Sequence, residues 1–166
     1  LGLIIGILFY EIGGFLSRLI RAVIILIFSS DFFETAQQGS VNTTPPPPPP
    51  NPLIIWTLII VGVLFNYGII ALSEEFLYRG VIMKEINHIS KSLGIIISSF
   101  IFMIYHVFPG IVPLETFVSF GIYYFIFGLL LSGITLLQKD DLITTIIAHG
   151  TFNSIIWVNR YLSYLN

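Results

Sequence analysis

The chain has little charge and no cysteine. Of its 166 residues, 55% are hydrophobic and 10% are charged, whereas about 25% are charged in an average soluble domain. The absence of cysteine excludes a disulfide framework, a thiolate metal site and a cysteine nucleophile. A net charge of −2 without a basic stripe argues against a nucleic-acid partner. Because so few charged side chains could not coat a water-soluble globule, the composition predicts an integral membrane protein.

Long apolar stretches recur along the chain, over 1–33, 53–72, 93–108, 116–137 and 142–158. They are continuous, which favours membrane helices over the alternating strands of a barrel. A helix also satisfies its own backbone hydrogen bonds in hydrocarbon, where water is absent. We therefore expect an all-α, polytopic transmembrane bundle of about five spans, with a polar cavity inside the membrane.

The sequence divides into three expected parts: an N-terminal membrane segment over 1–34, a proline-rich loop over 35–52 and a core over 53–166. The N-terminal segment is apolar but interrupted by Glu11, Arg18 and Arg21, so it is either one long helix or the remnants of two. The first residue is Leu rather than Met, so the sequence leaves open whether this segment is truncated.

The proline-rich loop contains six consecutive prolines, Pro45–Pro50. Proline lacks an N–H and fixes φ, so this run cannot be helical and favours polyproline II. We interpret it as a stiff, solvated linker between spans. A ligand for an SH3-type domain is the alternative, but the usual basic residue is missing from its flanks.

The distribution of lysine and arginine predicts the orientation of the spans. Neither residue occurs between Arg21 and Arg79, so the proline-rich loop is expected on the non-cytoplasmic side, as is the short loop 109–115. The opposite side is expected to be cytoplasmic because it carries Lys84, Lys91 and Lys139.

Two adjacent glutamates follow the long uncharged run of the second stretch. Ionisable groups inside a membrane cost about 2.5–3.5 kcal/mol each on insertion scales and are functional candidates by default. Arg79 lies four residues beyond Glu75, on the same helical face, and can neutralise it. Glu74 is rotated by roughly 100° and is free to face another helix. The alternative is an interfacial glutamate–arginine pair that ends a span.

Two further polar elements lie inside apolar stretches. His106 lies deep in the third stretch, where a lone histidine is most often a packing residue. His149 and Asn153 are four residues apart, so they share one helical face and can donate hydrogen bonds to one point. Their alternative role is to hold helices together through polar contacts.

The polar elements are expected at one depth in the membrane. A hairpin that turns near Ser90 puts Glu74 and His106 level with each other, on the order of 15 Å inside the bilayer. His149 lies ~12 Å beyond Asp141 along its helix, and Asn153 lies ~18 Å beyond Asp141. Unrelated polar residues would not share a depth, so one buried site is predicted.

Two details of the second and third stretches complete this prediction. The segment 53–73 is longer than half a bilayer requires, so we expect either a kink near Gly68 or a broken, partly re-entrant helix. His88 falls in the polar turn between the two stretches and is expected to be a solvated bystander.

Taken in order, these elements resemble the motifs of the CAAX protease and bacteriocin-processing family, also called CPBP or ABI, which includes the type II CAAX prenyl endopeptidase. The family pattern is EExxxR, then FxxxH, then HxxxN. The resemblance covers about 53–166, while the N-terminal block is shorter than in fuller members. Tyr78 stands where many members carry Phe, and Gly80 also fits. The matching residues are Glu74-Glu75…Arg79, Phe102…His106 and His149…Asn153.

This resemblance implies a glutamate protease: an intramembrane endopeptidase that acts on a membrane-associated peptide or a lipidated, for example prenylated, protein. It implies that Glu74 and His106 activate the attacking water, that His149 and Asn153 stabilise the oxyanion, and that Glu75 and Arg79 brace the site. No cofactor is expected. The implied location is the plasma membrane of a prokaryote or the endoplasmic reticulum membrane of a eukaryote.

Three alternatives stay open. One is a zinc version of the same enzyme, in which Glu74, His106 and His149 hold the metal and water fills the fourth position, although the usual HExxH helix is absent. The second is a non-catalytic membrane protein, such as an immunity factor, a scaffold or a chaperone subunit. Transport is less well supported, because no inverted repeat is visible.

Overall fold

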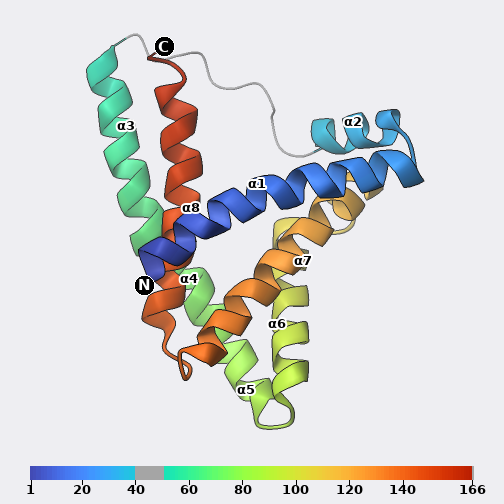
Figure 1. The fold of residues 1–166 in the computed structure, drawn as a ribbon, viewed down its shortest axis with the longest axis vertical. Helices are drawn as coiled ribbons and strands as arrows, with labels where there is room; N and C mark the ends of the chain where they lie inside the picture. Colours follow the sequence, from blue (N-terminus) through green and yellow to red (C-terminus); the bar gives the residue numbers. More distant parts are fainter. Residues whose placement is uncertain (40–50, 166) are drawn as a thin grey trace.

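The computed structural model describes residues 1–39 and 51–165, and this part of the chain is built from helices (Figure 1). The predicted all-α fold is confirmed. One long helix in the middle of the sequence consists of several segments, which are described below. The other helices are α1 (Gly2–Ile27), α2 (Ser30–Gly39), α6 (Lys91–His106), α7 (Leu114–Leu137) and α8 (Leu142–Leu162).

The N-terminal segment forms one long helix, α1, rather than two spans, and the short α2 follows it. Helix α2 ends at Gly39, so it extends into the region predicted as loop from residue 35. It packs on α7, where the Thr116 hydroxyl donates to the Ala36 carbonyl oxygen at 2.9 Å. The hexaproline run Pro45–Pro50 lies outside the described residues.

The second apolar stretch is a continuous helix over 52–87. Its segments are α3 (Pro52–Phe65), α4 (Leu72–Glu75) and α5 (Lys84–Asn87), joined by the wide π-helical turns η1 (Asn66–Ala71) and η2 (Phe76–Met83). The helix begins where the Asn51 side chain accepts a hydrogen bond from the Leu53 N–H at 2.8 Å.

Gly68, where a kink or a break was expected, lies within η1, and the helix continues through it. A π-helical turn accommodates an extra residue and changes which side chains face the bundle. The two glutamates of α4 lie between the two π-helical turns.

Three of the described helices are long and apolar enough to cross a membrane: α1, the 36-residue helix Pro52–Asn87, and α7. Helix α6 is apolar but shorter, and α8 has 21 residues with a more polar composition. Helix Pro52–Asn87 is ~54 Å long, whereas the hydrocarbon core is about 30 Å thick, so part of it extends beyond the core.

The bundle is apolar outside and contains small polar residues inside. Large hydrophobic side chains are exposed along every long helix of the described chain. Serine and threonine hydroxyls join α7 to its neighbours, with Ser132 at 3.3 Å from Ser98 of α6 and Thr135 at 3.0 Å from Thr145 of α8. This distribution is typical of helices that associate in lipid, where burial of apolar surface does not drive packing.

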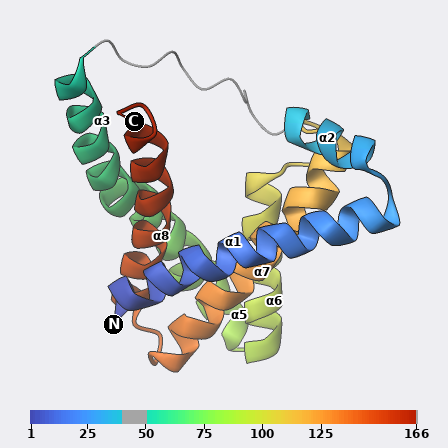
Figure 2. The ribbon, with the colours of Figure 1, turned by 45° about the horizontal axis from the view of Figure 1, so that its top comes forward.

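Helix α1 crosses the bundle and packs on α8 and α7, while α6 lies beside α7 (Figures 1 and 2). Helices α3 and α8 run side by side at one end. The α5–α6 turn and the α7–α8 turn lie together at the opposite end, and the predicted cytoplasmic lysines are in or next to these turns.

Candidate active site

A fully buried ion pair, Glu75 with Arg79, supports the site. The Arg79 Nη1 donates to Glu75 Oε1 at 2.9 Å, one helical turn away, and both side chains are 0% exposed. The Arg79 Nη2 donates to the Gly128 carbonyl oxygen of α7 at 3.0 Å. The guanidinium carbon lies 4.8 Å from the Phe102 ring centroid. Arg79 therefore connects helix 52–87 to α6 and α7.

His149 lies between the two glutamates. Its Nδ1 is 2.7 Å from Glu75 Oε1, and its Nε2 is 3.7 Å from Glu74 Oε2. An ionised carboxylate only accepts hydrogen bonds, so Nδ1 carries a proton in this arrangement. Glu75 therefore fixes the orientation of the His149 ring and directs Nε2 toward Glu74.

His106 approaches Glu74 from α6. Its Nδ1 is 2.9 Å from the Phe102 carbonyl oxygen, which only accepts, so Nδ1–H is the donor. In the neutral ring, Nε2 then carries a lone pair, and it is 3.9 Å from Glu74 Oε2. The ring also stacks on Tyr124 of α7, with centroids 4.4 Å apart and planes 25° apart.

Glu74 faces a cavity of about 200 Å³ that the two histidines also line. Its Oε2 is buried and has no hydrogen-bond partner among the described residues. The separations of 3.7 and 3.9 Å from the two Nε2 atoms are too long for direct hydrogen bonds. Because Oε2 itself has almost no accessible surface, the cavity meets Glu74 through the rest of its side chain, which is 13% exposed. The cavity is large enough for several waters, at ~30 Å³ each.

Asn153 lines the same cavity, one turn of α8 beyond His149, and is half-buried. Most of the remaining wall is aromatic and comes from α6, α7 and α8. The cavity therefore combines a few polar groups with apolar walls, as binding pockets commonly do. The aromatic lining residues are Phe102, Tyr123, Tyr124, Phe127 and Phe152.

The structure brings together all six residues singled out in the sequence, from helix 52–87, α6 and α8. Glu74, His106, His149 and Asn153 line the cavity, whereas Glu75 and Arg79 contact the lining residues His149 and Phe102. The roles assigned to them remain predictions. His88 is exposed in the turn between α5 and α6.

Sequence reasoning missed the contribution of α7. Tyr124 lines the cavity and stacks on His106, yet its helix carries no charge between its first turn and its end. The available signal was the pair Tyr123-Tyr124, two phenols in an otherwise apolar span, because a buried tyrosine hydroxyl needs a partner.

Among the described residues, no group of three or more histidine, cysteine, aspartate or glutamate side chains is arranged to hold a metal ion. The set proposed for zinc, Glu74, His106 and His149, is therefore not such a group in this geometry. Two histidine nitrogens nevertheless lie within 4 Å of the same carboxylate oxygen, at 3.9 and 3.7 Å.

The fold and the site define a class: a polytopic helical membrane protein whose helices surround a cavity lined by ionisable side chains. Comparison with protein families identifies the family within this class. The family described as type II CAAX prenyl endopeptidase Rce1-like matches residues 52–155, and the chain belongs to it. This family is one of membrane-embedded proteases. No curated protein and no solved structure matches the chain.

Proposed function

We propose that the chain is an intramembrane endopeptidase in which Glu74 and His106 activate a water molecule for attack on a peptide bond. One observation carries the proposal: Glu74 Oε2 is buried without a partner among the described residues, and the Nε2 atoms of two histidines approach it in a cavity that can hold water. Membership of a protease family supports the same reaction class.

Water activation follows from the hydrogen-bond roles of the two side chains. A water in the cavity donates one O–H to the Glu74 carboxylate and the other to the lone pair on His106 Nε2. Glu74 takes a proton as the water oxygen bonds to the peptide carbonyl carbon. The proton then passes to the departing nitrogen and the C–N bond breaks, after which the new carboxylic acid gives its remaining proton to the amine, so that a carboxylate and an ammonium result.

Stabilisation of the oxyanion is assigned to His149 and Asn153. As an imidazolium, His149 donates Nδ1–H to Glu75 and directs Nε2–H into the cavity. The charges of Glu74, Glu75, Arg79 and His149 then sum to zero. The Asn153 amide supplies a second donor, and in a dry site one such donor contributes typically about 2.7–4 kcal/mol.

The substrate is proposed to be a membrane-associated peptide or a lipidated protein. A cavity enclosed by membrane helices is accessible to chains that are themselves held in or at the bilayer. Prenylated proteins of the CAAX type are the substrates that the family description indicates.

The test is cleavage of a panel of lipidated and unlipidated peptides by the purified protein in liposomes. Glu74→Gln keeps the shape and removes the base, so we expect cleavage to fall by about 10²–10⁴-fold without loss of the folded state. Glu85→Gln, on the same helix but exposed, is the matched control and should cleave like wild type. An active Glu74→Gln variant would contradict the proposal and favour a non-catalytic membrane protein.

Zinc held by Glu74, His106 and His149 is the second candidate: two histidine nitrogens lie within 4 Å of one carboxylate oxygen, although the three side chains are not arranged as a metal site in the described part of the chain. A bound zinc ion would supply a Lewis acid and lower the pKa of its water. Metal analysis and cleavage after strong chelation decide between the two. Activity that survives chelation, in protein free of zinc, would exclude the metal version.

A further inference from the structure

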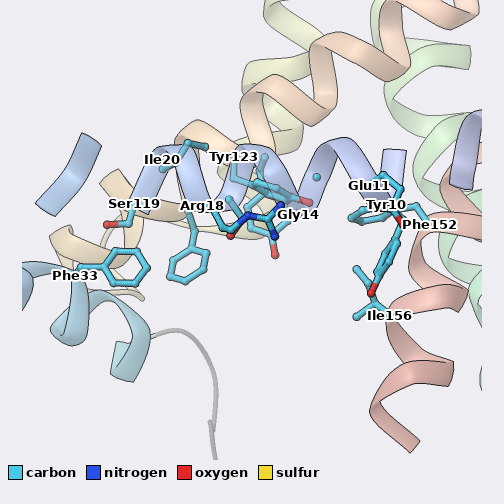
Figure 3. Close-up of a pocket in the computed structure, with 14 residues that line it drawn as sticks. Tyr10, Glu11, Gly14, Arg18, Ile20, Phe33, Ser119, Tyr123, Phe152 and Ile156 are labelled. Atoms are coloured by element: carbon cyan, nitrogen blue, oxygen red, sulfur yellow. The ribbon is translucent and has the colours of Figure 1, made fainter. Parts of the chain in front are cut away.

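Two charged side chains of α1, Glu11 and Arg18, have no partner within the described part of the chain. Both are exposed, and neither makes a hydrogen bond or an ion pair there. They line a cavity of about 600 Å³ between α1, α2, α7 and α8, which we call the α1 groove (Figure 3). Helix α1 is long and apolar enough to span a membrane, and unpaired charges in such a helix are costly. A partner from outside the chain would lower this cost.

Glu11 and Arg18 lie on the face of α1 that points away from the bundle. At 100° per residue, they are roughly 150–170° around the helix axis from the mean direction of the buried residues of α1. The buried face is already occupied, because α1 packs on α8 and α7 with it. A partner therefore reaches the two charges from outside the bundle. The buried residues are Gly2, Gly6, Phe9, Gly13, Ile20 and Ile24.

The outward face of α1 carries a pattern that is complementary to itself. Ile4, Glu11, Arg18 and Ile25 follow one another at intervals of seven residues, so they lie close to one line along the helix, with a drift of about 20° per interval. We call these four residues the α1 seam. When the direction is reversed, the order apolar, acidic, basic, apolar becomes apolar, basic, acidic, apolar. Two seams that run in opposite directions therefore place each charge opposite a counterion.

We propose that the α1 seam binds a second copy of this chain, with the two α1 helices running in opposite directions about a twofold axis. Glu11 then faces Arg18 of the partner subunit, and the same contact repeats on the other side of the axis. At the ends of the seam, Ile4 faces Ile25 of the partner subunit. Gly14, which is exposed, lies beside the axis, where its lack of a side chain lets the helices approach closely. All four charges are paired in this dimer, and the inference does not depend on the proposed function.

The direction of α1 in the fold makes this arrangement compatible with a membrane. Figures 1 and 2 show α1 running across helix 52–87 and α8 rather than alongside them. A twofold axis along the membrane normal keeps both copies in the same orientation. Because this axis reverses every direction within the membrane plane, two helices that lie across their bundles meet running in opposite directions. A parallel pair would instead place like charges together, which is unfavourable.

The first test reverses the charges of the seam. The full chain is placed in liposomes, and energy transfer between donor-labelled and acceptor-labelled copies measures self-association, with the labels on His88→Cys in the exposed α5–α6 turn. We expect Glu11→Arg alone and Arg18→Glu alone each to weaken self-association about tenfold or more, because each variant places like charges opposite each other. A mixture of the two variants should associate like wild type, because each copy supplies the charge that the other needs. This rescue also shows that both variants fold.

Arg21→Glu is the matched control, since it reverses the same charge on the same helix but off the seam. Its guanidinium lies 5.3 Å from the Phe33 ring centroid, and we expect the variant to associate like wild type. A wild-type chain that stays monomeric, because lipid or another protein covers the seam, would overturn the proposal. Failure of the mixture to associate, or an equal loss with Arg21→Glu, would overturn it as well.

The second test determines the direction of the two helices by disulfide cross-linking, for which the chain has no cysteine of its own. Phe15 is 62% exposed and lies beside the twofold axis, so Phe15→Cys should cross-link to its counterpart under mild oxidation. Ile4→Cys is ~32 Å from its counterpart in the proposed dimer and should cross-link only to a copy that carries Ile25→Cys. Cross-linking of Ile4→Cys to itself would show a parallel pair and contradict the proposal.

Discussion

Two adjacent glutamates acquire different surroundings in this protein. Glu75 is 0% exposed and contacts Arg79 and His149, whereas the Glu74 side chain is 13% exposed and faces the cavity. The spacing of four residues was sufficient to predict the Glu75–Arg79 pair. The contact between Glu75 and His149 was not predicted, because it depends on how α8 packs against helix 52–87.

Arg79→Ala tests the bracing role of the buried pair. It leaves the Glu75 carboxylate buried without its cation, and breaking such a pair typically costs about 3–5 kcal/mol. Thermal unfolding in detergent should show a large loss of stability or no folded protein. Glu74→Gln, which leaves the pair intact, should unfold like wild type. An Arg79→Ala variant as stable as wild type would show that the two glutamates have been assigned the wrong roles.

Tyr124 tests whether the aromatic wall positions a catalytic group. Its ring stacks on His106 at 4.4 Å, so Tyr124→Leu should lower kcat about tenfold or more by loosening the imidazole. Tyr124→Phe keeps the ring and should stay close to wild type. If both variants lose activity equally, the hydroxyl rather than the stacked ring matters. Steady-state cleavage of a single peptide measures kcat and KM separately.

The starts of the helices followed from local chemistry, but the path of the long helix did not. Ser90 and Asp141 accept hydrogen bonds from the first turns of α6 and α8, at 3.4 and 3.1 Å, and side chains of this type favour these positions. The pattern of apolar residues does not predict the π-helical turns η1 and η2. Their position around α4 is set by contacts with other helices, which periodicity does not reveal.

Gly128 tests the close approach of α6 and α7. A Cβ at this position would lie 3.0 Å from Ser99 Cα, so Gly128→Ala forces the helices apart and moves the carbonyl that binds Arg79. Overpacking of this kind costs typically about 1–3 kcal/mol. Gly133→Ala on the same helix meets open space and should unfold at or above the wild-type temperature. Equal unfolding temperatures for the two variants would contradict this packing.

At the scale of the whole molecule, composition alone predicted a membrane protein, and the exposed apolar exterior agrees with it. Hydropathy also located the long helices. The α1 groove could not be predicted, because it forms where helices distant in sequence meet, and the outward direction of the α1 seam depends on how α1 packs on α7 and α8.

Because the chain lacks cysteine, single-cysteine variants can test its orientation without background labelling. His88→Cys and Gln138→Cys lie in turns at the same end of the bundle and should react with a membrane-impermeant maleimide from one side. Ile111 lies in the α6–α7 loop and its side chain is 81% exposed, so Ile111→Cys should react from the other side. Sealed vesicles of known orientation give the measurement, and labelling of all three from one side would contradict the topology.

Arg79 holds three helices together through Glu75, Gly128 and Phe102, while the side chain of the proposed base makes no hydrogen bond within the described part of the chain. Natural variation can therefore remove hydrolysis from such a protein without unfolding it. A duplicated gene that lost the carboxylate at position 74 would still encode an intact bundle with its groove, free to be selected as a receptor for membrane peptides. Loss of Arg79 would instead unfold the bundle, so no folded receptor could arise from it.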